Sequence, residues 1–286
     1  MSIPHECLPS DCAPSCPEVF ERLLVFPRIR GGTRVEWLMD RDFTDPLPYT
    51  FQLQVGTAGD HDISDWTPVG STVVNGWYLL DDQERVFGLQ QWTHYRVQLV
   101  TSKGTYYSDP APCLGLWDFR QWRRACGVLR NEMLNFRAGE APEGYLLKRR
   151  VQGEPCSCLD PLTQECRNPD CLICYGTSWV GGYFQPLGCV YAALSEQATH
   201  SHIEAEGPRG AGGDIIVKAR MLALPQLQEK DVWINKTTDH RYIVHTIQSA
   251  CEIKGVPLVY DPVELRLAPF TNIIYDIPIP DLVPQE

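Results

Sequence analysis

Positive charge and long apolar runs are both scarce in this 286-residue chain. Lys and Arg number 25 against 36 Asp and Glu, which gives a net charge of −11 at pH 7. Proteins that wrap nucleic acid gain most of their affinity by neutralising phosphates, so we expect no sequence-specific nucleic-acid partner. No apolar run approaches the ~20 residues of a transmembrane helix, and we expect no membrane partner. The opening MSIPHECLPSDC lacks the basic and apolar regions of a secretory signal.

The motifs of common enzyme families are absent as well. We find no G-x-S-x-G elbow, H-E-x-x-H helix, phosphate loop or dinucleotide fingerprint. His200, His202 and Glu204 alternate, so a strand would place them on one face as a metal site, although an ordinary exposed strand explains the same run. Asp239 and His240 lie in a predicted hairpin turn, where we expect an Asx-type turn rather than an acid–base pair. We therefore predict a protein that is not an enzyme.

Proline and glycine are plentiful, with 23 and 22 residues, and they separate short runs in which apolar and polar residues alternate. From about residue 20 to residue 115, such runs follow one another at hairpin-like intervals. The clearest run has four apolar residues at every second position: Tyr49, Phe51, Leu53 and Val55. Alternation with frequent turns predicts an antiparallel β-sandwich over residues 20–115.

Three details make residues 20–115 resemble a fibronectin type III domain. Trp37 lies in an early strand, Tyr95 begins a late strand, and a Lys103-Gly104 turn precedes the last strand. The resemblance implies that Tyr95 is a tyrosine-corner residue whose hydroxyl bonds to upstream backbone. Domains of this kind usually bind or space other proteins and rarely catalyse reactions.

The first 19 residues contain three cysteines and four prolines, which exclude a regular helix or a central strand. We predict an extended N-terminal arm over residues 1–19. Cys7, Cys12 and Cys16 are candidates for cross-links between subunits. Metal ligation and free thiols remain the alternatives for these three residues.

Residues 116–150 change to a helical period and are predicted to form a helix followed by a linker. One apolar stripe has spacings of three and four residues: Phe119, Trp122, Cys126, Leu129, Met133 and Phe136. Asp118 is the predicted N-cap and Gly139 the predicted stop. Five arginines occupy other positions: Arg120, Arg123, Arg124, Arg130 and Arg137. We favour a solvated basic face, and the alternative is a helix that packs on an acidic neighbouring subunit.

The densest chemistry lies in the cysteine-rich segment, residues 151–189, where five cysteines fall within nineteen residues. Cys156 and Cys158 form a C-x-C pair, and Cys171 and Cys174 form a C-x2-C pair. Two such pairs can converge on one tetrahedral zinc ion, because thiolates are soft donors. We predict a structural zinc site on these four residues, with Cys166 as a substitute for one thiol of the C-x-C pair. The alternative is two disulfides and one free thiol.

The string C-x-C-x-D…C-x-x-C-Y-G-T…G-G-Y, from Cys156 to Tyr183, resembles a cysteine-rich segment of tailed-bacteriophage virion structural proteins. Four later strings resemble the small β-barrel of phage head-closure and neck proteins: Asp231-Val-Trp-Ile (the D-x-W string), Arg241-Tyr-Ile-Val, Val263-Glu-Leu-Arg-Leu-Ala-Pro and Tyr275-Asp-Ile-Pro-Ile-Pro. Together the resemblance covers about residues 145–280, and Cys166 departs from the pattern. It implies a β-barrel-like domain over residues 190–286, where short β-rich runs also predict strands.

The resemblance implies a structural protein of a tailed-phage virion at the neck or head-to-tail junction. It implies a ring of identical chains, with portal, head-closure and tail proteins of the virion as partners. A tail or baseplate component and a host-surface adhesion module are the alternatives, and a cell-wall hydrolase ranks behind both. We thus predict a mainly β, multidomain protein: arm, sandwich, helix, cysteine-rich segment and barrel-like domain.

Overall fold

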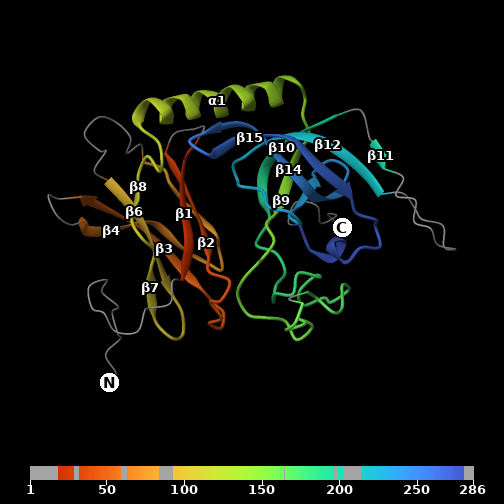
Figure 1. Ribbon diagram of the computed structural model, residues 1–286, viewed down its shortest axis with the longest axis horizontal. Coiled ribbons are helices and arrows are strands. Elements are labelled where there is room, and N and C mark those ends of the chain that lie inside the picture. The colour runs from red at the N-terminus through yellow and green to blue at the C-terminus, as the bar shows by residue number, and fades with distance from the viewer. Residues whose placement is uncertain are drawn as a thin grey trace, which may run out of the picture. The chain divides into compact units, whose positions relative to one another are not determined.

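The computed structural model describes residues 19–28, 32–58, 63–83, 93–163, 165–195, 199–201 and 214–279. Within these ranges strands dominate and a single α-helix occurs, which confirms the mainly β prediction (Figure 1). The chain divides into a first unit, residues 1–126 with 151–157, and a second unit, residues 127–150 with 158–286. The predicted N-terminal arm lies outside the described residues, together with Cys7, Cys12 and Cys16.

The first unit contains two antiparallel sheets. One sheet has three strands in the order β1-β2-β5: β1 (Phe20–Pro27), β2 (Thr33–Met39) and β5 (Tyr78–Asp81). The other has the order β4-β3-β6-β7, with β8 paired to β6: β3 (Thr50–Ala58), β4 (Ile63–Val74), β6 (Thr93–Val100), β7 (Thr105–Tyr107) and β8 (Ala111–Pro112). In β3 the apolar residues of the alternating run are buried and the glutamines between them are half-buried, as period-2 patterning requires.

Two contacts join strands of the two sheets in the first unit. The rings of Trp37 on β2 and Phe51 on β3 lie 4.7 Å apart. The fully buried hydroxyl of Tyr95 on β6 donates to Oδ2 of Asp81 on β5 at 2.8 Å. The bond from Tyr95 to upstream backbone that the tyrosine corner implies stays a prediction. Residues 84–92, which directly precede β6, lie outside the described residues.

The helix α1 (Phe119–Ala138) begins and ends where the sequence predicts. Asp118 accepts a hydrogen bond from the backbone N–H of Gln121, and the Gln121 side chain accepts from the N–H of Asp118. This reciprocal pair is a capping box, which satisfies two N–H groups that have no partner inside the helix. Trp122, Leu129 and Phe136 of the predicted stripe are buried.

The second unit contains a closed antiparallel barrel of six strands in the order β10-β9-β13-β14-β15-β12, with β12 paired back to β10. Its strands are β9 (Glu143–Leu147), β10 (Leu187–Leu194), β12 (Asp214–Leu222), β13 (Val232–Asn235), β14 (Arg241–Ile253) and β15 (Val256–Leu267). β11 (Thr199–Ser201) extends the sheet beside β12, and a 3-10 turn follows at Ile273–Asp276. Closure removes the exposed edges that an open sheet would present.

One barrel strand comes from a part of the chain that the sequence analysis assigned to a linker. β9 pairs with β10 on one side and with β13 on the other, so the ring cannot close without it. Its last four residues are all buried, and its apolar run therefore lacks the alternation that reveals a half-exposed strand. Gly144 allows close packing here, because an added Cβ would lie 2.2 Å from the carbonyl oxygen of Ile234.

Candidate metal centre

The cysteine-rich segment leaves the barrel after β9 and returns to it at β10. Backbone hydrogen bonds close its base: the N–H of Phe184 donates to the carbonyl of Lys148, and the N–H of Arg150 donates to that of Gly182, both at 2.9 Å. Arg149 and Tyr183 form a β-bridge between these bonds. The two ends of the segment are therefore fixed side by side, which brings its cysteines within reach of one another.

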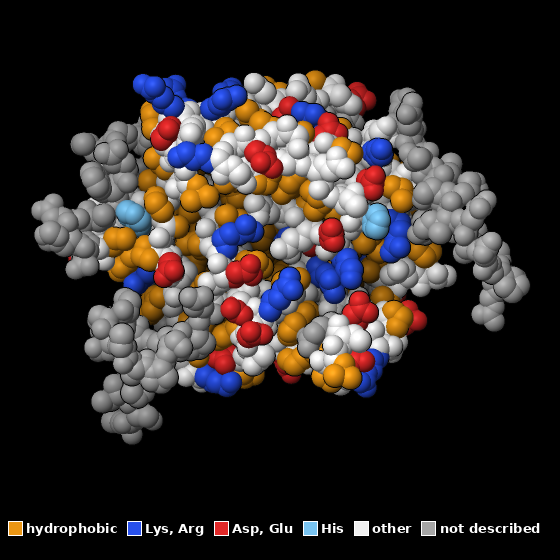
Figure 2. All heavy atoms as spheres, in the orientation of Figure 1, with side chains coloured by type: hydrophobic (Ala, Val, Ile, Leu, Met, Phe, Trp, Pro, Cys, Tyr) orange, Lys and Arg blue, Asp and Glu red, His pale blue; other side chains and the backbone are white. Residues whose placement is uncertain are grey.

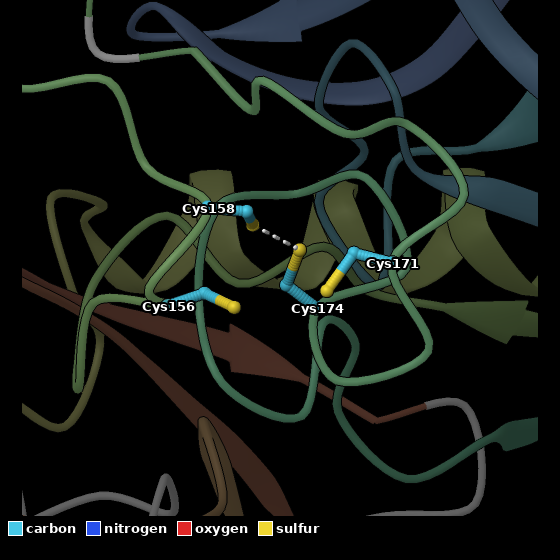
Figure 3. Close-up of side chains that lie close together, drawn as sticks. All are labelled: Cys156, Cys158, Cys171 and Cys174. Carbon is cyan, nitrogen blue, oxygen red and sulfur yellow. Dashed lines mark hydrogen bonds between the residues drawn. The ribbon is translucent and has the colours of Figure 1, made fainter.

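Four of the six cysteines of the segment converge. The sulfur atoms of Cys156, Cys158, Cys171 and Cys174 all lie within 4.8 Å of one another, and Figure 3 shows them pointing toward a common centre. Cys156 and Cys174 are buried, and the other two are half-buried. A tetrahedral ion with ~2.3 Å metal–sulfur bonds holds its sulfurs about 3.8 Å apart. The arrangement can therefore hold a metal ion on the four residues that the sequence singled out.

A tight turn around Cys174 explains the C-Y-G-T string. The backbone N–H and the hydroxyl of Thr177 both donate to the carbonyl of Cys174, at 2.9 and 2.7 Å. Tyr175 and Gly176 have positive φ angles of 49° and 73°. An added Cβ at Gly182 would lie 2.6 Å from the same Cys174 carbonyl, so only glycine fits there. The Thr177 hydrogen bonds and the glycine at position 182 thus hold the backbone around the Cys174 carbonyl.

Cys166 lies at the margin of this cluster. Its sulfur is 3.2 Å from that of Cys158 and 3.6 Å from that of Cys174. It also donates to the carbonyl of Asn168 at 2.9 Å. The structure thus places the fifth thiol beside the centre, yet the four mutually close sulfurs are those of the other cysteines.

Two ionisable groups of the segment have shifted pKa values. Hydrogen bonds from the backbone N–H of Leu162 and from the Arg167 side chain lower the pKa of Asp160 below its ordinary value. Burial raises the pKa of Tyr183 to about 12, so its phenol stays neutral at physiological pH. The segment therefore keeps an anionic carboxylate at its surface and a neutral phenol at its base.

A buried carboxylate fastens the base of the segment to the barrel. Asp231 is fully buried, and its Oδ2 lies 3.0 Å from Nζ of Lys148 and accepts from the N–H of Gln228 at 2.7 Å. Its Oδ1 accepts from the N–H of Arg149 at 2.8 Å. In the sequence Asp231 stands out only as the first residue of the D-x-W string, and its anchoring role was not predicted. An acidic residue directly before an apolar β run was the available signal.

The other sequence candidates do not form a catalytic site within the described residues. Asn235 accepts from two backbone N–H groups of the β13–β14 turn, as an Asx-type turn requires. Asp239 pairs with Arg241 at 3.4 Å, while the ring of His240 lies 5.7 Å from that of Phe270. His200 belongs to β11, but its side chain lies outside the described residues, as do His202 and Glu204.

Separate serine substitutions at Cys166 and at Cys156 test which thiols hold the metal ion. We expect Cys166→Ser to retain one metal ion per chain and Cys156→Ser to lose most of its metal, because only the second change leaves three of the four clustered sulfurs. Metal content per chain, measured by elemental mass spectrometry after gel filtration, gives the answer. Loss of metal in Cys166→Ser with retention in Cys156→Ser would reverse the assignment.

Together, fold and site define a mainly β protein whose closed barrel carries a four-cysteine centre able to hold a metal ion. In the described part of the chain, α1 is too polar to cross a membrane and no other helix is long enough to do so. Comparison of the chain with family models, curated proteins and solved structures gave no match. Any functional conclusion therefore depends on the barrel, the cysteine centre and their order in the chain.

Proposed function

We propose that this chain is a structural protein of a tailed-phage virion, placed at the neck or head-to-tail junction, where it assembles into a ring. One observation carries the proposal: the cysteine-rich segment is inserted between two adjacent strands of a closed barrel, and β13 follows Asp231 of the D-x-W string. The same parts occur in the same order in the sequence resemblance to neck proteins. The ring would form by heterologous contacts between identical chains.

We propose zinc as the metal of the cysteine centre. Four thiolates favour zinc over hard cations such as Ca²⁺ or Mg²⁺, which prefer oxygen ligands. Cys156, Cys158, Cys171 and Cys174 would hold the ion, and it would supply a cross-link rather than a reaction. Such a cross-link is needed because the exposed segment buries few apolar side chains of its own, and structural zinc contributes about 10–16 kcal/mol in small metal-dependent units.

We also propose that the first unit is a fibronectin III-like sandwich that decorates the ring as a collar element. Its three-stranded and five-stranded antiparallel sheets, with a tryptophan and a tyrosine linking them, support this assignment. The net charge of −11 suits a conduit that DNA passes without adhering. Portal, head-closure and tail proteins are the proposed partners, and Cys7, Cys12 and Cys16 are proposed to cross-link subunits after lysis.

The oligomeric state of the purified full-length chain tests the proposal. With zinc and reductant present, we expect native mass spectrometry to show one closed oligomer with a fixed copy number, and negative-stain images to show rings. A chain that stays monomeric at tens of micromolar concentration, or that grows open filaments, would contradict ring assembly. A monomer that binds bacterial cells would instead support the adhesion module.

A further inference from the structure

We propose that the contact between neighbouring copies in the ring is made by the cysteine-rich segment of one copy and the exposed face of α1 in the next copy. This inference rests on the proposed ring and names the surfaces that build it. Each surface combines exposed apolar side chains with charged groups that form no ion pair with other described residues, and the two charges have opposite signs. The occupant of the helix face is therefore a second copy of this chain.

The exposed face of α1, called the α1 face below, combines apolar and basic side chains. Five residues with spacings of three and four lie on one side of the helix: Phe119, Arg123, Gly127, Arg130 and Leu134. Phe119, a member of the predicted apolar stripe, is exposed, and the five residues lie about a third of a turn around the helix from the buried Trp122, Leu129 and Phe136. Phe119 and Leu134 are 42% and 54% exposed, so the α1 face offers apolar side chains near both ends of the helix.

Four arginines of α1 have no acidic partner among the described residues. Among the described residues, Arg120, Arg123, Arg124 and Arg130 form no ion pair. The only acid of the helix, Glu132, is already bound to Arg220 at 2.9 and 3.0 Å. Figure 2 shows blue side chains along the upper edge of the molecule, over α1. Because the chain as a whole carries −11, another copy offers the acidic surface that this basic helix lacks.

A glycine opens a notch in the middle of the α1 face. An added Cβ at Gly127 would meet nothing within 4 Å. Glycine weakens the interior of a helix relative to alanine, and among the described residues no neighbour requires it at this position. Its absent side chain lets an apolar group of a partner approach the helix backbone between Arg123 and Arg130.

The cysteine-rich segment has the complementary surface. Leu172 and Ile173, 66% and 55% exposed, lie between Cys171 and Cys174, so a metal on the two thiols fixes both side chains in the solvent. Leu162 is 91% exposed nearby in the sequence. The segment's apolar groups can enter the notch in the α1 face because the metal, rather than burial, holds them in place.

The same segment carries negative charge. Glu165 and Asp170 are exposed, and no ion pair involves either of them within the described residues. Arg167, the single arginine of the cysteine-rich segment, is paired with Asp160. Four thiolates around one divalent ion add a doubly negative centre. The segment thus matches the α1 face in both its apolar and its charged groups.

The two surfaces lie on different parts of one chain, so their contact is heterologous. Within the second unit, Figure 1 shows residues 127–138 of α1 and residues 158–183 on opposite sides of the barrel. One copy therefore offers a segment on one side and a helix on the other. Repetition of such a contact closes into a ring when its rotation divides a full turn.

A charge swap tests the pairing in the full-length, zinc-loaded chain. We expect Arg123→Glu/Arg130→Glu to raise the dissociation constant of assembly about 100-fold, because acids would then face acids. Glu165→Arg/Asp170→Arg should weaken assembly similarly, and the quadruple variant should recover most of it. The matched control is Lys218→Glu/Lys230→Glu, which makes the same charge change at two exposed lysines of the second unit that form no ion pair with the described residues. Gly127→Gln should also weaken assembly by filling the notch.

Mass photometry across a concentration series gives the dissociation constants, and thermal melting shows that each variant is folded. If Arg123→Glu/Arg130→Glu forms rings as well as the wild type does, or if the folded quadruple variant stays dissociated, this interface is wrong and the ring proposal still stands. A wild type that stays monomeric would contradict both the interface and the ring. If a DNA duplex binds the wild type but not Arg123→Glu/Arg130→Glu, and the rings are unchanged, the α1 face is a phosphate-binding surface and the inference is wrong.

Discussion

Replacing Cys174 by serine is expected to abolish stoichiometric metal binding and to unfold the cysteine-rich segment while the barrel stays folded. Cys174 is fully buried and its sulfur lies 3.2 Å from that of Cys158, at the centre of the cluster. Its carbonyl also accepts the two hydrogen bonds that shape the following turn. The metal accounts for about 10 kcal/mol or more of folding free energy in units of this kind, so losing one of four ligands removes the main source of order.

Elemental analysis and hydrogen exchange measure the two parts of this prediction. Metal should fall from about one ion per chain to nearly none, and amides of residues 151–183 should exchange quickly while those of β13 and β14 stay protected. Cys189→Ser is the matched control, because Cys189 is exposed and outside the cluster. Full protection of the segment in metal-free Cys174→Ser would contradict a structural metal. A wild type without metal, whose mass rises by two hydrogens per bridge on reduction, would establish disulfides instead.

Replacing Asp231 by alanine is expected to lower the free energy of unfolding of the barrel by about 3–5 kcal/mol. The substitution removes the carboxylate that faces Nζ of Lys148 at 3.0 Å, in a site where both side chains are almost fully buried. The backbone N–H groups of Arg149 and Gln228 lose their acceptor in the same step. A buried donor without an acceptor costs its full desolvation energy, which is why this change exceeds the loss of an ordinary surface pair.

Hydrogen exchange of β9, β13 and β14 amides reports the stability of the barrel separately from that of the first unit. The control is Lys148→Met/Asp231→Leu, which removes both charges and should recover part of the loss, since no buried charge is left uncompensated. Asp231→Asn should fall between wild type and alanine, because the amide oxygen still accepts one hydrogen bond. A change below about 0.5 kcal/mol in Asp231→Ala would show that the ion pair does not anchor the barrel.

Local patterns in the sequence were sufficient for several elements of this protein. The extent of α1 followed from the spacing of its apolar stripe, from Asp118 at its start and from Gly139 after its end. Helix caps and amphipathic spacing involve residues within about four positions of one another, so the chain alone defines them. Alternation likewise identified β3 and β6. The four cysteines were recognisable because two short pairs restrict where their thiols can point.

Other features were decided only by the tertiary structure. β9 looks like a short apolar run until it pairs with β10 and β13, which lie far along the chain. The acceptor of the Tyr95 hydroxyl is a carboxylate on another sheet, and Asp231 meets Lys148 across 83 positions. These contacts depend on which strands become neighbours when the sheets form.

The sequence by itself therefore determined the strand-rich composition, the helix and the identity of the candidate ligands. Tertiary structure decided that the barrel closes, that the base of the cysteine-rich segment is fastened by Asp231, and that Cys166 lies beside the cluster. The physical reason is range. Periodicity, caps and turns are set by neighbours along the chain, whereas closure, buried ion pairs and sulfur positions depend on long-range pairing that no local pattern encodes.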